Sequence, residues 1–325
     1  MCPQNAGPGN RIHGSAVASG IAVGAGMLSA KPRDVSAAQP LKTSSQAAIP
    51  LRHRRTHLPV IVHADDFGET DDITEGICLA IEAGVVTSTS VMANMPGTAA
   101  ALRCAPQLGR QASFGVHLNL CEGRPLTRGA TLTDAGGRFL RKRTLATRAL
   151  AGKLSLRELE AEVAAQISLL SDAGIRISHL DGHKHLHQLP IVCAAVANVL
   201  PRFGIERVRI TRLGGWLRAR GAMTLAREIA ARHAARVFAH AGLRSPARTI
   251  DLRDLIGGHA LDAAAGRAAA DREPVEVCAH PGTAAADAGK PGSHRRGDEL
   301  EYLLSPAFRA VLAAGGAALV SYWRV

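Results

Sequence analysis

Four short segments of this 325-residue chain place carboxylate or imidazole side chains at the end of an apolar run: HADDFG, FGVHLNL, SHLDGHKHLH and AHPG. They supply Asp65, Asp66, His117, His183 and His280. Two histidines and one carboxylate hold a divalent ion while leaving coordination positions open, as a hydrolytic metal requires. The second carboxylate is then available to take a proton from water, and a histidine on another strand can protonate a leaving amine. This division of labour suits hydrolysis of an amide bond.

Each segment taken alone has an ordinary structural explanation. An Asp pair before glycine often forms a turn or caps a helix. His63 and His179 have the features of structural residues, and His185 and His187 are expected around the ion or at the surface rather than on it. Asp181 is a candidate for orienting a ligand histidine from behind. It is the combination of the four segments that favours a metal site.

The elements that position these residues alternate between short apolar strands and amphipathic helices. This alternation predicts a parallel sheet, and the polar clusters fall at the C-terminal ends of its strands, where α/β folds carry their sites. The pattern alone does not separate a closed barrel from an open sheet. Strands are expected at 58–64, 85–93, 114–120, 175–180, 208–210, 275–280 and 318–322, and helices at 71–83, 99–108, 156–173, 190–200 and 306–314.

The composition narrows the class of protein. The net charge is +12, but about half of the excess lies before residue 58, and no basic stripe is interleaved with aromatic residues, so no nucleic-acid partner is expected. No apolar run approaches the ~20 residues that cross a bilayer. The six cysteines form no CxxC pair and lie in apolar contexts, which favours a reducing compartment and a cytoplasmic location.

Two regions of the chain differ in composition. Residues 1–56 are rich in Gly, Ala, Ser and Pro, which predicts a disordered tail, with a targeting segment or a misassigned start as alternatives. Residues 57–325 are long and apolar enough to form a single α/β domain.

In order and rough spacing, the four segments resemble those of the YdjC-like carbohydrate deacetylases, the ChbG/HpnK family. The resemblance extends from about Leu58 to the C-terminus and includes the ending, where Arg296 begins RGDEL and is followed by LSP and VSY. His63 departs from it, because Asn or Thr is more usual at that position. The resemblance implies an irregular (β/α) barrel of the polysaccharide-deacetylase type.

The same resemblance implies roles for individual residues. Asp66, His117 and His183 match the metal ligands, Asp65 matches the general base, and His280 matches the histidine expected to act as general acid. Family members are usually assigned Mg²⁺, whereas two imidazoles suit Zn²⁺, Mn²⁺ or Co²⁺ better. The implied substrate is an N-acetylated sugar, either a chitooligosaccharide or a glycosylated hopanoid-type lipid.

Other functions and partners remain open at this stage. A metal-dependent phosphoesterase or another amidase on the same barrel is one alternative, and a non-catalytic sugar- or metal-binding protein is another. A binding protein has no need for both Asp65 and His280. Arg212 is a weak candidate for gripping a sugar or phosphate, a homodimer is an alternative to a monomer, and the aromatic residues available for stacking on a sugar are Trp216, Tyr302, Tyr322 and Trp323.

Overall fold

The computed structural model describes residues 57–211, 222–271, 273–287 and 295–325. The predicted tail at 1–56 lies outside these ranges, as do Arg212 and Trp216. The strands are β1 Leu58–Phe67, β2 Ser88–Val91, β3 Ser113–Leu118, β4 Ile177–Gly182, β5 Arg248–Asp251, β6 Val275–Ala279 and β7 Ala317–Leu319. The helices are α1 Asp71–Glu82, α2 Thr98–Leu108, α3 Lys142–Leu150, α4 Leu156–Asp172, α5 Pro190–Val199, α6 Ala222–His240, α7 Leu252–Ile256, α8 Leu261–Ala265, α9 Arg267–Asp271, α10 Arg296–Leu304 and α11 Pro306–Ala314.

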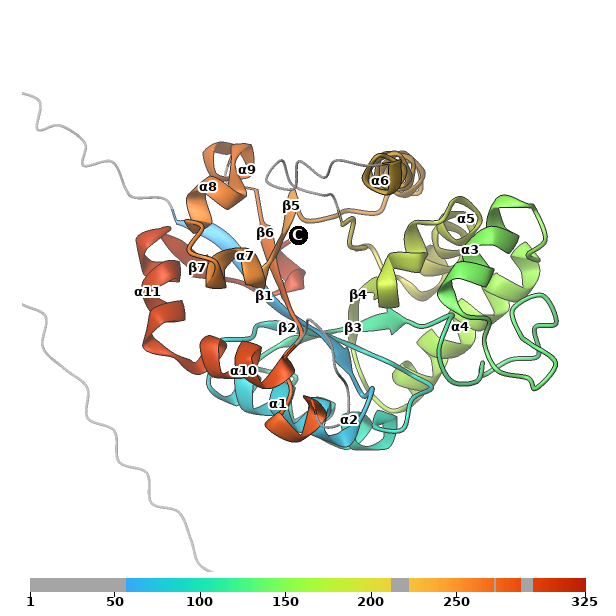
Figure 1. The fold of residues 1–325 in the computed structure, drawn as a ribbon, viewed down its shortest axis with the longest axis horizontal. Coiled ribbons are helices and arrows are strands. Elements are labelled where there is room, and N and C mark those ends of the chain that lie inside the picture. The colour runs from blue at the N-terminus through green and yellow to red at the C-terminus, as the bar shows by residue number, and fades with distance from the viewer. Residues whose placement is uncertain (1–56, 212–221, 272, 288–294) are drawn as a thin grey trace, which may run out of the picture. The chain divides into compact units, whose positions relative to one another are not determined.

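The strands form one parallel sheet in the order β4-β3-β2-β1-β6-β5, with β7 paired to β1 (Figure 1). Isolated bridges from Leu180 to Val208 and from Arg207 to Arg244 then connect the β4 edge to the chain that precedes β5. The sheet therefore curls towards closure, which confirms the predicted α/β fold with an irregular barrel. Helices lie outside the sheet, with α1 and α2 on one side and α4 and α5 on another (Figure 1).

The prediction of a regular strand at 208–210 is wrong. Val208 makes a single bridge to β4, through the backbone bonds of Leu180 with Arg207 and Arg209, and the other side of this segment bonds to Arg244. The expected strand at 318–322 is also shorter than predicted, since β7 ends at Leu319. The α11 helix has the predicted bounds.

Side chains of β1 alternate between two environments, as they must along a strand. Val60, Val62 and Ala64 pack in the apolar core shared with the helices. His63 and Asp65, on the opposite face, are fully or almost fully buried among other polar groups in the barrel interior. The fold thus places a polar layer inside the barrel and directs it towards the C-terminal strand ends.

The described part of the chain was searched for membrane-spanning helices and for disulfides. None of its helices is both long enough and apolar enough to cross a membrane. Its five cysteines are all free. 

Gly76 lets α1 contact the turn that follows β6. A Cβ at Gly76 would lie 2.6 Å from the backbone of Gly282, closer than carbon atoms approach. We expect Gly76→Ala to lower the free energy of unfolding by about 1–3 kcal/mol through overpacking, as measured by urea denaturation. Gly109→Ala is the matched control, because its Cβ would meet nothing nearer than 3.6 Å. Equal losses in the two variants would contradict the role of this contact.

Candidate active site

A cavity of about 220 Å³ opens at the C-terminal ends of the strands. It is lined by all five residues that the sequence singled out for chemistry, together with three further basic residues. The lining residues are Asp65, Asp66, His117, His183, Lys184, His185, His280 and Arg296.

Asp66, His117 and His183 form a compact, buried cluster of ligand-type atoms. The Oδ1 atom of Asp66 lies 3.1 Å from Nε2 of His117 and 2.9 Å from Nδ1 of His183. One such atom from each residue lies within 4.8 Å of the other two. Asp66 itself has a φ of 70°, an uncommon conformation for a residue with a Cβ, at an irregularity in the pairing of β1 with β2. Such strained positions are held by the surrounding structure and concentrate at functional sites.

The register between β3 and β4 explains how His117 is oriented. His117 lies directly opposite Asp181, and its Nδ1–H donates to Oδ1 of Asp181 at 2.8 Å. The hydroxyl of Ser90 donates to the other oxygen of Asp181 at 2.9 Å. This leaves Nε2 of His117 directed at Asp66. A carboxylate behind a histidine is the usual support for a metal ligand, so the donor set fits a divalent ion.

Asp66 presents one oxygen to the histidines and the other to an arginine. A guanidinium nitrogen of Arg296 donates to Oδ2 of Asp66 at 2.6 Å and to Glu69 at 2.8 Å. Burial opposes ionisation of Asp66, but hydrogen bonds from His117 and His183 keep its pKa well below the usual value. Asp66 is therefore a charged residue whose Oδ1 atom is available as a ligand.

Asp65 turns into the barrel interior, away from the direction of Asp66. Both of its oxygens contact Arg209, at 2.9 Å for Oδ2 and 2.8 Å for Oδ1. Burial would raise the pKa of Asp65, but the positive charge of Arg209, together with the charges of His117 and His280, outweighs burial and holds the pKa below its ordinary value. The carboxylate is ionised at neutral pH, as a group that accepts protons must be.

His280 approaches from the turn after β6. Its Nε2 atom lies 3.7 Å from Oδ2 of Asp65, and its Nδ1 atom lies 4.0 Å from a carboxylate oxygen of Glu299 in α10. Its side chain is 24% exposed, compared with 5% for Asp65. The imidazole therefore stands between the buried carboxylate and the open cavity.

Comparisons with known proteins agree with this geometry. The family model of YdjC-like proteins matches residues 59–314. The chain belongs to the YdjC-like family. A mouse protein named carbohydrate deacetylase is 34% identical over 304 residues, which cover 80% of this chain and 92% of the mouse protein. The human carbohydrate deacetylase is 35% identical over 298 residues, covering 82% of this chain and 90% of the human protein.

One solved structure shows the same fold. It is an Enterococcus faecalis V583 protein named for cellobiose-phosphate cleavage, with a TM-score of 0.64 and 22% sequence identity to the YdjC-like chain. The match covers 83% of this chain and 99% of that one. At this identity the likeness concerns the fold alone.

Sequence reasoning missed Arg209, which connects the polar layer of this YdjC-like barrel. The side chain has no exposed surface. Its Nε–H donates to Oε1 of Glu276 at 2.8 Å, and NH1 lies 3.0 Å from Oδ2 of Asp181, in addition to the contacts with Asp65. The hydroxyl of Tyr322 donates to the second oxygen of Glu276 at 2.9 Å. The available signal was an arginine within the apolar run Val-Arg-Ile, whereas the sequence analysis considered Arg212.

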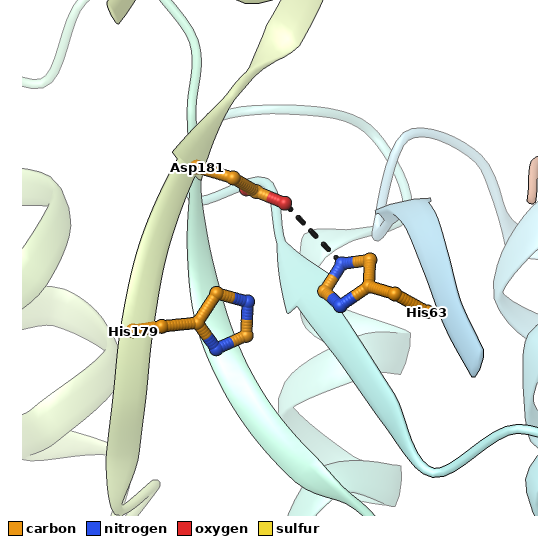
Figure 2. Close-up of side chains that lie close together, drawn as sticks. All are labelled: His63, His179 and Asp181. Carbon is orange, nitrogen blue, oxygen red and sulfur yellow. Dashed lines mark ion pairs between the residues drawn. The ribbon is translucent and has the colours of Figure 1, made fainter. Parts of the chain in front are cut away.

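A second histidine pair lies deeper in the barrel. Figure 2 shows His63 on β1 facing Asp181 and His179 on β4, with Nε2 of His63 3.2 Å from Oδ2 of Asp181. Arg209 already contacts that oxygen at 3.0 Å, so a cation there would meet a guanidinium charge. The ring of His179 stacks on Tyr322 with centroids 3.6 Å apart. Each histidine thus has a partner in the barrel interior, and the structural role expected from the sequence stays a prediction.

The remaining histidines of the third segment differ in position. His187 is buried, and its Nε2–H donates to the backbone carbonyl of Arg209 at 3.0 Å. Burial lowers the pKa of His187 to about 4, so the ring is neutral and supports the Arg209 segment. His185 lines the cavity but lies outside the Asp66 cluster.

Replacing Arg209 tests the buried network directly. Arg209→Gln removes the positive charge that compensates Asp65, Asp181 and Glu276, and breaking a buried ion pair typically costs about 3–5 kcal/mol. We expect a loss of that size in the free energy of unfolding from urea denaturation. Arg202→Gln, at an exposed position, is the control and should change stability by less than about 0.5 kcal/mol.

If Arg209→Gln does not fold, Arg209→Lys gives the second measurement. It keeps the charge but cannot contact three carboxylates with one planar group, so an intermediate loss of stability is expected. Wild-type stability in Arg209→Gln would show that the network contributes nothing.

Proposed function

We propose that this chain is a metal-dependent hydrolase that removes the acetyl group from an N-acetylated sugar. The observation that carries the proposal is the grouping, in one cavity, of the Asp66–His117–His183 cluster with Asp65 and His280. The mouse and human relatives, which are named carbohydrate deacetylases, support a sugar as the substrate. A chitooligosaccharide and a glycosylated hopanoid-type lipid are the two candidate substrates, and the cytoplasmic location stays a prediction.

Asp66, His117 and His183 would hold one divalent ion. When bound, such an ion supplies a Lewis acid that polarises the acetamide carbonyl and lowers the pKa of water. Two imidazole nitrogens and one carboxylate oxygen favour Zn²⁺, Mn²⁺ or Co²⁺ over Mg²⁺, which prefers oxygen ligands. Asp181 fixes the orientation of His117 through the 2.8 Å hydrogen bond, and this pre-organises the donor set.

Asp65 and His280 divide the proton transfers. Asp65 is ionised and held by Arg209, so it accepts a proton from the attacking water without changing its own position. His280 is the more accessible group, and its Nε2 atom faces the cavity beside Asp65. It delivers a proton to the departing amine nitrogen. The C–N bond then breaks to give acetate and a free amino sugar.

Removal of the metal tests the first part of this proposal. Complete chelation is expected to abolish release of acetate from N-acetylglucosamine oligomers, and addition of Zn²⁺, Mn²⁺, Co²⁺ or Mg²⁺ in turn should restore it to different extents. The added ion should also raise the melting temperature of the wild-type protein, because it binds the folded state. The Asp66→Ala variant should show no such rise. Acetate release that survives complete removal of metal would contradict the proposal.

The role of Asp65 is tested by Asp65→Asn. Turnover should fall by about 10²-fold or more, because general-base assistance is lost, whereas the bound metal should stay at one ion per chain. Metal analysis and acetate assays measure the two quantities on the same sample. Asp71→Asn, at an exposed position in the first turn of α1, is the control and should retain activity. Normal turnover by Asp65→Asn would show that another group is the base.

A further inference from the structure

His63 lies within the polar layer inside the barrel and has no exposed surface. Its ring belongs to β1, and the polar atoms around it come from three other strands as well as from β1 itself. Nδ1 lies 3.0 Å from Oγ of Ser88 on β2 and 3.7 Å from Oε1 of Glu276 on β6. Nε2 faces Asp181 on β4 (Figure 2). This one imidazole therefore contacts side chains from both sides of its own strand.

Three oxygen atoms lie at nearly equal distances from Nε2 of His63. Oγ of Ser90 lies 3.2 Å away, Oδ2 of Asp181 also 3.2 Å, and Oδ1 of Asp65 3.3 Å. Asp65 is the proposed base, and Asp181 is the carboxylate that orients His117, a proposed metal ligand. The ring nitrogen thus lies beside both carboxylates on which the proposed chemistry depends.

The hydrogen bonds of two serines indicate which nitrogen of His63 carries the proton. The hydroxyl of Ser90 donates to Oδ2 of Asp181 at 2.9 Å, so its oxygen accepts from Nε2. The hydroxyl of Ser113 donates to Oγ of Ser88 at 2.9 Å, which leaves the Ser88 hydroxyl to donate to Nδ1. Nε2 is therefore the protonated nitrogen, and the positive end of its N–H group lies beside the two carboxylates.

The carboxylate of Asp65 needs such a group on this side. Its Oδ1 atom is buried, and no hydrogen bond of good geometry reaches it from the described residues, although a guanidinium nitrogen of Arg209 lies 2.8 Å away. Arg209 is also shared with Asp181 and Glu276. A carboxylate turns easily about its last side-chain bond. A second positive dipole beside Oδ1 limits that rotation and weakens the repulsion between the two carboxylates.

We propose that His63 is a positioning residue for the hydrolysis: its Nε2–H group fixes the Asp65 carboxylate relative to Asp181, and hence relative to the metal ligand that Asp181 orients. This inference rests on the proposed function and deepens it. Catalytic groups must be held within about 0.5 Å of their productive geometry, so loss of this group slows turnover. His63 is buried and does not line the active-site cavity, so its loss should leave substrate binding unchanged.

The test compares two replacements of His63 in the metal-loaded enzyme. His63→Leu removes the N–H group and keeps a side chain of similar size, whereas His63→Gln keeps an amide N–H that reaches the position of Nε2. Release of acetate from N,N′-diacetylchitobiose gives kcat and KM. We expect kcat of His63→Leu to fall about tenfold or more, with KM within about twofold of wild type. His63→Gln should recover kcat to within about threefold. Metal analysis should give one ion per chain in every protein.

The matched control is His179→Leu, because His179 is a second fully buried histidine of the same layer. It contacts Ser178 and Tyr322. We expect His179→Leu to lower the melting temperature, as His63→Leu does, but to keep the wild-type kcat and KM. A purely structural His63 would give this same pattern in both leucine variants. If His63→Leu does not fold, His63→Met replaces it, because the unbranched methionine side chain adapts to irregular gaps.

Three results would overturn the inference while leaving the deacetylase proposal intact. The first is a wild-type kcat in the variant that lacks the N–H group. The second is a loss that appears in KM rather than in kcat. The third is a His63→Gln variant that is as slow as His63→Leu, since the amide N–H would then contribute nothing.

Failure of the proposed function gives a different result. If the metal-loaded wild type releases no acetate, the deacetylase proposal is wrong, and crystal structures of the wild type and of the leucine or methionine variant then decide the inference. A rotation of the Asp65 carboxylate that moves Oδ1 by about 1 Å or more in the variant would support positioning by His63. An unchanged Asp65 carboxylate would overturn it.

Discussion

A single buried guanidinium, that of Arg209, compensates three buried carboxylates, and the arrangement of the polar interior depends on it. Asp65, Asp181 and Glu276 all lie within hydrogen-bond distance of it. Without a positive charge among them, carboxylates in such surroundings would take up protons, because burial disfavours the ionised form. Arg209 keeps Asp65 available as a base and Asp181 available as an acceptor behind His117. The proposed base, Asp65, and the proposed metal ligand His117, which Asp181 orients, therefore depend on the same positive charge.

The strand geometry gives two consecutive carboxylates different environments. Asp65 follows the alternation of β1 and faces the interior, where it contacts Arg209. At Asp66 the backbone adopts a positive φ and the pairing with β2 shifts, so its Oδ1 atom contacts the two histidines. The register between β3 and β4 places Asp181 directly opposite His117. Local backbone geometry thus gives neighbouring residues the different surroundings that their separate roles in the proposed metal-assisted hydrolysis require.

Much of this organisation could be predicted from the sequence, and the omissions share a physical cause. The apolar residues before HADDFG and AHPG and within FGVHLNL predicted the strands and hence which polar residues would meet. Arg209 and Glu276 were missed because only closure of the barrel brings these distant residues together. The α6 helix was missed because its large apolar residues Leu225 and Ile229 are exposed, whereas its buried face is formed by Ala231, Ala234 and Phe238, so the sequence shows no clear apolar stripe. The α3 helix has one buried residue, Leu145, and begins with two basic residues, Lys142 and Arg143, so the sequence shows no apolar stripe there.

The central claim is that one divalent ion binds at Asp66, His117 and His183. Anomalous X-ray diffraction from crystals of the metal-loaded protein, recorded on both sides of the absorption edge of the bound metal, tests it most directly. The account predicts one anomalous peak with Asp66 Oδ1, His117 Nε2 and a ring nitrogen of His183 as its protein ligands. A peak between His63, His179 and Asp181 instead, or none at the predicted position in crystals of active enzyme, would contradict it.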